Sequence, residues 1–306
     1  MRSDLDHLPE RQQSELERVR AILLEEFDRA IATATQPHRR KGQIYKIILF
    51  GSYARSDWVD EPDNGYQSDF DLLVIVSHED LTDIADYWYV AEDRIARDLA
   101  IGRPVNLIVH ALDEVNAALK RGEYFWIDIA RDGIALYALP CHELTTPMPL
   151  TPADAFAMAK GYFDHWASSI EEWIEMAASA IARGHTGGWP ANAAFLLHQT
   201  TERAYACFLL VHTLYFPRSH NIKFLRSLAE DKAPRLVEAW PRDTRKDRAR
   251  FERLKRAYVE ARYSASYEIT AEDLDALAGS IARLRDIVVA LCTERLAALE
   301  QAAGIG

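Results

Sequence analysis

Two carboxylates stand two residues apart in the segment Ser68-Asp69-Phe70-Asp71, which leads into an apolar run that ends at Val76. Side chains two apart on a β-strand point to the same face, so Asp69 and Asp71 can bind one cation together while Phe70 points into a core. Carboxylate oxygens are good ligands of hard cations. The spacing therefore predicts a cation site at the start of a strand.

A glycine-serine turn lies upstream of the carboxylates, where Gly51 and Ser52 follow the short apolar run Tyr45–Phe50. Glycine lets the backbone approach a ligand closely, serine supplies a hydroxyl, and the amides freed at the start of the following helix suit a phosphate. Together the turn and the carboxylate pair predict a site for a metal-complexed triphosphate. The alternative is a surface loop that ends in a strand with ordinary N-terminal acids, because each motif is common alone.

The elements that would position these residues alternate between helix and strand, as their apolar periodicity indicates. In chain order we expect an amphipathic helix at about 9–35, strands at 45–50, 68–76 and 103–110, helices at 81–99 and 113–120, and a short helix, a turn and a last strand within 123–139. The helix at 81–99 should direct to the core the side chains Ile84, Trp88, Ala91, Ile95 and Leu99, and its aromatic residues 87–89 should be core residues. The polar segment 57–67 either folds over a bound ligand or is a passive insertion.

The segments Gly51-Ser52-Tyr53-Ala54-Arg55 and Ser68-Asp69-Phe70-Asp71, in this order and between two apolar strands, resemble the signature of the polymerase-β-like nucleotidyltransferases, especially the minimal prokaryotic group. The resemblance implies that the two aspartates hold Mg²⁺ on the nucleotide and that the glycine-serine turn holds its phosphates. Arg55 would neutralise charge that develops on the leaving phosphates. The implied reaction moves a nucleoside monophosphate from a nucleoside triphosphate, with ATP expected, to a hydroxyl acceptor and releases pyrophosphate.

The third carboxylate of that family lies on a strand next to the Asp-x-Asp pair, and the matching position in this chain holds Asn106. We include Asn106 with Asp69 and Asp71 in the implied catalytic set. An amide can coordinate a metal through its oxygen, but it brings no negative charge and cannot take a proton. The metal that activates the attacking hydroxyl should therefore bind more weakly than in relatives with three carboxylates.

From Thr151 onward every periodic segment is helical, and five helices are expected. The first runs to Arg183, and Gly187-Gly188-Trp189-Pro190 connects it to the second. The segment 140–152 lacks periodicity, so we place the domain boundary there and expect a nucleotidyltransferase domain at 1–145 and a helical domain at 146–306. The predicted fold class is α+β: a mixed sheet with helices, followed by an all-α bundle.

Three polar segments punctuate these helices: His198-Gln199-x-x-Glu202-Arg203, Ser219-His220-Asn221-Ile222-x-Phe224-Leu225 and Ala261-Arg262-Tyr263. Their order resembles a HEPN domain over roughly 151–300, and the resemblance implies a homodimer formed through the helical domain. In HEPN ribonucleases, the arginine at the position of Arg262 is followed by four to six residues and then a histidine. No histidine follows His220 in this chain, so the general acid or base of that reaction is missing. We interpret His198 as a structural residue that faces Glu202 one turn later, and His220 as one near a helix cap.

The formal charge of −11 argues against a chain that wraps duplex nucleic acid with its whole surface. The basic helix at 242–263 is either a solvated helix with internal ion pairs or an anion-binding face. No apolar run reaches the ~20 residues needed to span a bilayer, and the N-terminus lacks the apolar stretch of a signal peptide. We therefore expect a cytoplasmic protein that does not enter the membrane and whose three cysteines are reduced.

Three functions are compatible with these features. The leading one is a prokaryotic Mg²⁺-dependent nucleotidyltransferase whose acceptor is a protein tyrosine, an RNA end or a small molecule. The second is a nucleotide-binding regulatory module with weak catalysis, because the third carboxylate is replaced. The third is an RNA-binding HEPN protein that lacks the ribonuclease histidine.

Overall fold

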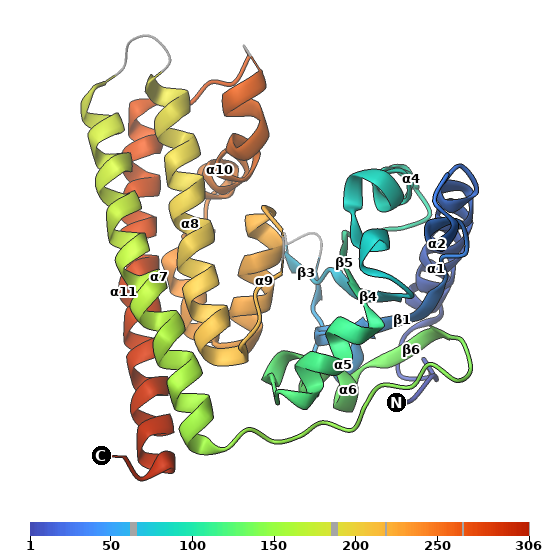
Figure 1. The fold of residues 1–306 in the computed structure, drawn as a ribbon. Coiled ribbons are helices and arrows are strands. Elements are labelled where there is room, and N and C mark those ends of the chain that lie inside the picture. Colours follow the sequence, from blue (N-terminus) through green and yellow to red (C-terminus); the bar gives the residue numbers. More distant parts are fainter. Residues whose placement is uncertain (62–65, 185–188, 218, 265, 306) are drawn as a thin grey trace. The chain divides into compact units, whose positions relative to one another are not determined.

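The computed structural model describes residues 1–61, 66–184, 189–217, 219–264 and 266–305, and the chain divides into two compact units, Met1–Pro149 and Leu150–Gly306 (Figure 1). The tip of the predicted polar segment, 62–65, and the Gly187-Gly188 part of the connector lie outside the described residues. The first unit holds a mixed sheet with helices and the second holds helices. The α+β class predicted from the sequence is confirmed.

The first unit is built on a four-stranded sheet with the order β5-β4-β1-β6. β4 (Phe70–Val76) pairs antiparallel with β1 (Ile44–Phe50) and parallel with β5 (Val105–Ala111). β1 also pairs antiparallel with β6 (Ile134–Ala138). All seven residues of β4 are buried, as a strand covered on both faces requires.

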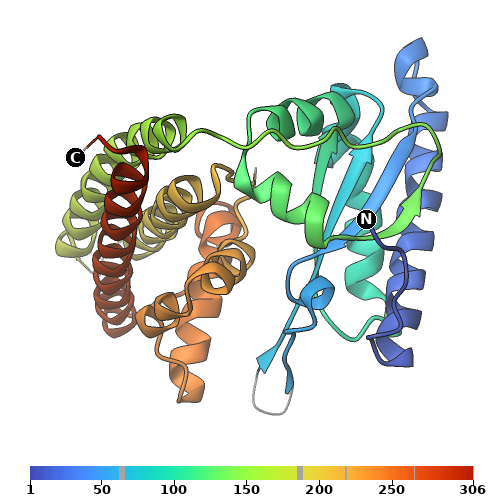
Figure 2. The same ribbon diagram turned by 90° about the horizontal axis from the view of Figure 1, so that it is seen from below.

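Helices cover both faces of this sheet (Figure 2). They are α1 (Glu10–Ala32), α4 (Tyr89–Arg97), α5 (Leu112–Lys120) and α6 (Tyr124–Asp132). On the α1 and α4 face, Phe27 stacks on Trp88 with ring centroids 5.1 Å apart. On the opposite face, Phe50 of β1 meets Phe125 of α6 at 5.7 Å. The two faces therefore have separate apolar layers.

Short elements complete this unit. They are α2 (Pro37–Arg40), the single turn α3 (Ser52–Arg55), and the strands β2 (Asp60–Glu61) and β3 (Tyr66–Gln67), which pair antiparallel. The predicted polar segment thus contains a small hairpin.

The helix predicted at 81–99 is wrong in its bounds and in part of its face. The structure has a 3-10 helix at Glu79–Thr82, a π-helical turn at Ile84–Trp88, and then α4. A π-helical turn inserts an extra residue, so the apolar register shifts, and Tyr89 is 62% exposed although Trp88 is fully buried. Leu99 is fully exposed because α4 ends two residues before it.

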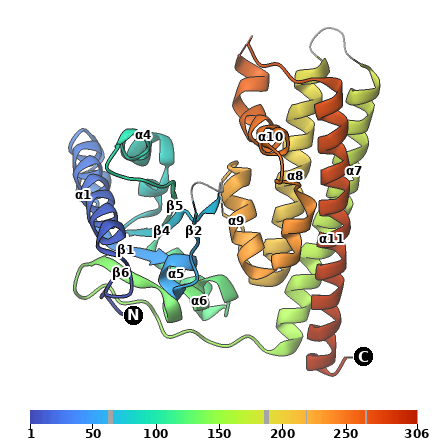
Figure 3. The same cartoon turned by 180° about the vertical axis from the view of Figure 1, so that it is seen from behind.

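The second unit is a helical bundle (Figure 3). Its elements are α7 (Pro152–Ala182), α8 (Trp189–Thr213), α9 (Ile222–Lys232), a 3-10 helix at Pro234–Ala239, α10 (Arg245–Tyr263) and α11 (Ala271–Ala303). α8 packs against α7, α9, α10 and α11 and forms the centre of the bundle. Over the described part of the chain, no helix combines the length and apolar character needed to cross a membrane.

Several basic residues of α10 form ion pairs with neighbouring acids. Arg250 and Arg253 both bind the carboxylate of Asp273 on α11, which is 3% exposed. Lys246 and Arg250 also bind Glu272. Burial alone would raise the pKa of Asp273, but the hydrogen bonds from Arg250 and Thr270 and the arginine charges lower this pKa on balance. These contacts favour the solvated, ion-paired interpretation of α10 over an anion-binding face.

Candidate functional site

Asp69, Asp71 and Asn106 converge at the start of the paired strands β4 and β5. Asp71 is the register partner of Asn106 in the parallel ladder. The amide Nδ2 of Asn106 donates to Asp71 Oδ1 at 2.9 Å and to Asp69 Oδ2 at 3.3 Å. All three residues are 5 to 7% exposed. The structure thus brings the three predicted catalytic residues into one hydrogen-bonded cluster.

Gly51 lies directly against this cluster. Its φ of +74° is a conformation that glycine adopts without strain, and a Cβ built on it would stand 2.5 Å from Asp71 Oδ2. A side chain at this position would therefore displace the carboxylate. Ser52 follows as the first residue of α3 and is partly exposed. The glycine-serine turn and the carboxylates share one site.

Arg55 lies at the other end of α3, and its guanidinium pairs with Asp57 at 3.3 Å. Both residues are exposed. This placement puts Arg55 one helical turn beyond Ser52. Its predicted role at the phosphates remains a prediction.

The cluster offers the donor set of a hard cation. Among the residues that the structure describes, no group of three or more His, Cys, Asp or Glu side chains could hold a metal. Two carboxylates and one amide fit Mg²⁺, which takes oxygen ligands and commonly uses one or two protein carboxylates plus phosphates and water. The Asn106 amide places its N–H donor between the carboxylates, where it partly offsets their mutual repulsion. An Mg²⁺ ion bound there would need the amide to present its oxygen or to stay outside the coordination shell.

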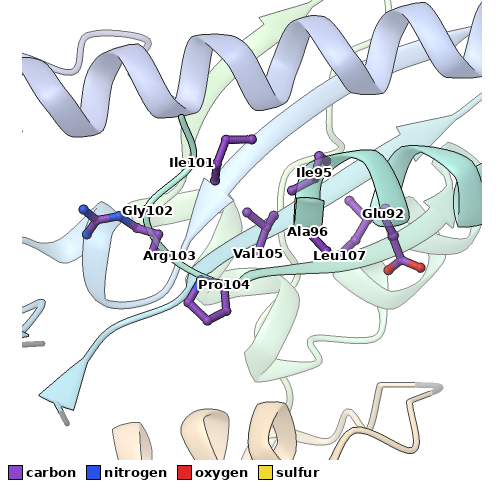
Figure 4. A pocket seen from close by; sticks show the side chains of 9 residues that line it. All are labelled: Glu92, Ile95, Ala96, Ile101, Gly102, Arg103, Pro104, Val105 and Leu107. Carbon is purple, nitrogen blue, oxygen red and sulfur yellow. The ribbon is translucent and has the colours of Figure 1, made fainter. Parts of the chain in front are cut away.

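A cavity lies on the face of β5 opposite to the carboxylate cluster (Figure 4). This cavity of about 430 Å³ is bounded by α4 and by the alternate β5 residues Val105 and Leu107. Glu92 is the acid on its wall, and burial raises the pKa of this carboxyl. The cavity and the carboxylate cluster thus use different faces of the same strand.

Sequence reasoning missed one buried residue beside the site. Arg103 precedes β5 and its side chain is fully buried, whereas the sequence predicted it only as the first residue of the strand expected at 103–110. A single arginine at the start of a strand carries no pattern that distinguishes it from a solvated residue. Its contacts are described below.

Of the two histidines interpreted from the sequence, His220 lies beside a helix cap as predicted, because the next residue, Asn221, is the N-cap of α9, whereas His198 does not face Glu202. Glu202 binds His220 Nδ1 at 3.0 Å, so the expectation that His198 faces Glu202 is wrong. The segment before α9 brings His220 over the Glu202 carboxylate, while His198 is fully buried with its ring 5.4 Å from that of Tyr258. Burial is the main cause that lowers the pKa of His198 to about 4, and the charge of His220 is the second. Neutral His198 is a packing residue of α8.

Arg262 is the residue at the position of the HEPN ribonuclease arginine. Its Nε donates to the Tyr258 carbonyl at 2.6 Å, and its guanidinium lies 4.4 Å from the Tyr258 ring and 5.0 Å from the Phe195 ring. The ring of His220 also stacks on the Tyr258 ring, with centroids 4.2 Å apart. The arginine is thus held among aromatic rings.

A mixed sheet with paired carboxylates beside a glycine-serine turn, followed by a helical bundle, is the architecture of a nucleotidyltransferase joined to a helical domain. The HEPN domain family model matches residues 163–291. A protein of Methanocaldococcus jannaschii named "Putative protein adenylyltransferase" is 32% identical over 97 residues, which are 32% of this chain and 82% of that relative. The chain therefore belongs to the minimal nucleotidyltransferase family and carries a HEPN domain fused behind the nucleotidyltransferase domain.

Proposed function

We propose that this protein is an Mg²⁺-dependent nucleotidyltransferase that moves a nucleoside monophosphate from ATP to a hydroxyl acceptor. The observation that carries the proposal is the convergence of Asp69, Asp71 and Asn106 against the Gly51 turn. The named activity of the Methanocaldococcus jannaschii relative supports a nucleotide donor and favours a protein acceptor.

Each residue has a separate task in the proposed reaction. Asp69 and Asp71 hold the metal-complexed triphosphate, and Ser52 with the backbone at Gly51 contacts its phosphates. Mg²⁺, when bound, neutralises phosphate charge and favours an ionised hydroxyl. The acceptor oxygen forms a bond to the α-phosphorus, the bond to pyrophosphate breaks, and pyrophosphate leaves with the electron pair. The Asn106 amide cannot accept the hydroxyl proton, which passes to a carboxylate or to solvent.

Calorimetry with ATP and Mg²⁺ tests the assignment. The double substitution Asp69→Ala and Asp71→Ala should abolish metal-dependent ATP binding and leave the fold intact, because neither side chain lies in the apolar layers. Asp93→Ala is a matched control, since Asp93 pairs with Arg97 on the surface of α4. Unchanged affinity in the double variant would contradict the nucleotide site.

A regulatory nucleotide-binding module is the second candidate, and Asn106 is the observation that favours it. An amide in place of a third carboxylate weakens the site for the metal that activates the acceptor without removing the Asp69 and Asp71 pair. Pyrophosphate release measured with labelled ATP separates the two functions. Tight ATP·Mg²⁺ binding without turnover for protein, RNA and small-molecule hydroxyls would favour the regulatory module.

A further inference from the structure

Arg103 occupies the side of the sheet that faces away from the carboxylate cluster. Its Nε donates to Glu15 Oε2 on α1 at 2.7 Å, and its Nη1 donates to the hydroxyl of Tyr53. Arg103 is 5% exposed and Glu15 is 2% exposed. This is a buried ion pair that reaches an aromatic hydroxyl.

The same guanidinium lies against two aromatic rings. Its Cζ is 5.2 Å from the centroid of the Tyr53 ring and 5.0 Å from that of Phe70. The two rings meet edge to face at 4.6 Å, and both are fully buried. In Figure 4 the guanidinium of Arg103 extends away from Val105, which lines the cavity beside β5.

These partners are the chain neighbours of the site residues. Tyr53 directly follows Ser52 in the phosphate-binding turn, and Phe70 stands between the two aspartates. Arg103 itself lies three residues before Asn106, and the Phe70 amide donates to the Pro104 carbonyl at 2.9 Å. One buried side chain therefore contacts two of the three segments that form the site and belongs to the third.

We propose that Arg103 is a positioning residue, which sets the spacing between the glycine-serine turn and the aspartate pair from the rear of the sheet. This inference rests on the proposed nucleotidyl transfer. A planar, forked guanidinium suits the task because it can hydrogen-bond in its plane and stack on rings with its faces, which a lysine cannot do. Asp71 Oδ2 leaves no room for a Cβ on Gly51, so a small shift of the turn changes where the phosphates lie relative to the carboxylates.

Arg103 with its partners Glu15, Tyr53 and Phe70, which we call the clamp, is also connected to α1 and to β2. Glu15 also accepts from Arg11 at 2.9 Å, and Arg103 Nη2 lies 3.6 Å from Asp60 Oδ2 of β2. Burial alone would lower the pKa of Arg103, but the hydrogen bond to Glu15 and the nearby charges raise it on balance. Arg103 is therefore a permanent cation inside the unit.

The experiment must separate positioning from simple stabilisation. Arg103→Met alone leaves Glu15 less well paired, so the main variant combines Arg103→Met with Glu15→Leu, because apolar replacement of both partners of a buried ion pair is commonly tolerated. Arg11→Met is the control: Arg11 binds the same Glu15 carboxylate, but its side chain is 72% exposed. Arg103→Lys and Tyr53→Phe are milder variants that keep the positive charge or the ring.

Three measurements on the full chain decide the matter: the melting temperature, ATP·Mg²⁺ affinity with kcat and KM for pyrophosphate release, and hydrogen exchange at the backbone amides of 51–54 and 68–71. We expect the double variant and Arg103→Lys to stay folded, to lose about tenfold or more in ATP·Mg²⁺ affinity or kcat, and to lose protection in both segments. Tyr53→Phe should show a smaller loss of the same kind, and Arg11→Met should match the wild type.

Two results overturn the inference. Folded Arg103 variants with wild-type affinity, kcat and exchange would reduce Arg103 to a stabilising residue, and an equal loss in Arg11→Met would assign the effect to Glu15 rather than to the clamp. Failure of the proposed function looks different, because the wild type itself would then bind no ATP·Mg²⁺. Hydrogen exchange would still report whether Arg103 holds the two segments.

Discussion

Asn106→Asp converts a pair of hydrogen bonds into a cluster of three carboxylates. In the wild type, Asn106 Nδ2 donates to Asp71 Oδ1 at 2.9 Å and to Asp69 Oδ2 at 3.3 Å, and a carboxylate at position 106 would place an oxygen at about these distances. Two like charges at these separations repel by about 6 and about 5 kcal/mol at an effective dielectric constant of about 20. The cluster is buried, so the repulsion is not relieved by solvent.

Proton uptake limits the cost of this repulsion. Protonating a carboxyl of ordinary pKa near 3.9 at pH 7 costs about 4 kcal/mol, which is less than the summed repulsion of about 11 kcal/mol. The metal-free variant therefore binds a proton at the cluster, and we expect a destabilisation of at most about 4 kcal/mol at pH 7. The pKa of the new carboxyl is raised in the folded state, so the penalty relative to the wild type grows as pH rises above 4 and shrinks by about 1.4 kcal/mol per unit as pH falls.

Magnesium should reverse the effect and add activity. A cation among three carboxylates replaces the proton, so the melting temperature of the variant in Mg²⁺ should rise toward that of the wild type. A third carboxylate also completes the site for the ion that activates the acceptor hydroxyl. We expect pyrophosphate release to rise by roughly ten- to a thousandfold, or about 1.4 to 4 kcal/mol of barrier.

Thermal melts between pH 4 and 8, with chelator or with Mg²⁺, together with pyrophosphate release, measure both effects. Asn116→Asp is a matched control, because Asn116 Oδ1 accepts from the Thr145 amide at 2.7 Å and a carboxylate oxygen can replace it. A variant of Asn106 that melts like the wild type at every pH, without response to Mg²⁺, would refute the convergence of the three side chains. An Asn106→Asp variant with unchanged metal stoichiometry and unchanged rate of pyrophosphate release would refute the role of position 106 as a third metal ligand in catalysis.

Three further outcomes follow from contacts in the two units. Gly51→Ala should weaken ATP·Mg²⁺ binding about tenfold or more, because the new Cβ would stand 2.5 Å from Asp71 Oδ2 at a strained φ. Calorimetry measures this affinity. Gly161→Ala is the control and should bind ATP·Mg²⁺ normally, because its new Cβ would meet no atom within 4 Å. Asp273→Asn should destabilise the chain by about 2 kcal/mol near neutral pH. The folded pKa of Asp273 is depressed, so its contribution is present above the unfolded pKa near 4 and is lost as pH falls further, and acid unfolding monitored by circular dichroism should become less steep in the variant. The chain should be a dimer by light scattering at about tens of micromolar. Trp166→Arg should weaken dimerisation, since this ring on α7 is only partly buried. A strict monomer in the wild type would argue against a helical interface.

The sequence predicted the placement of site residues well where functional side chains lie within one regular strand. Alternation along a strand predicts that Asp69 and Asp71 share a face and that Phe70 enters the core, and the structure has Phe70 fully buried. Their proximity to Asn106 required the pairing of strands 35 residues apart, and spacing within one strand carries no such information. The family resemblance supplied that link.

The parts that could not be predicted depend on packing between distant segments. The clamp at Arg103 joins α1, the turn and β4 through contacts that leave no periodic trace in the sequence. The shift before α4 arises from a single π-helical turn, which a pattern of apolar residues every three to four positions does not report. The roles of the site residues stay predictions until the substitutions above are measured.

The order of strands in the sheet has a genetic consequence. Asp71 belongs to β4, which is flanked on both sides, and Asp69 directly precedes this strand, whereas Asn106 lies on β5 at the edge of the sheet. A change on an outer strand disturbs one ladder, so position 106 can exchange its residue at lower cost to the fold than position 71. Asparagine and aspartate codons differ by one base. In the proposed mechanism, position 106 is the one that separates nucleotide binding from efficient transfer, and a single point mutation can interconvert its asparagine and aspartate. On that proposal, lineages of this fold would gain or lose catalysis without rebuilding the site.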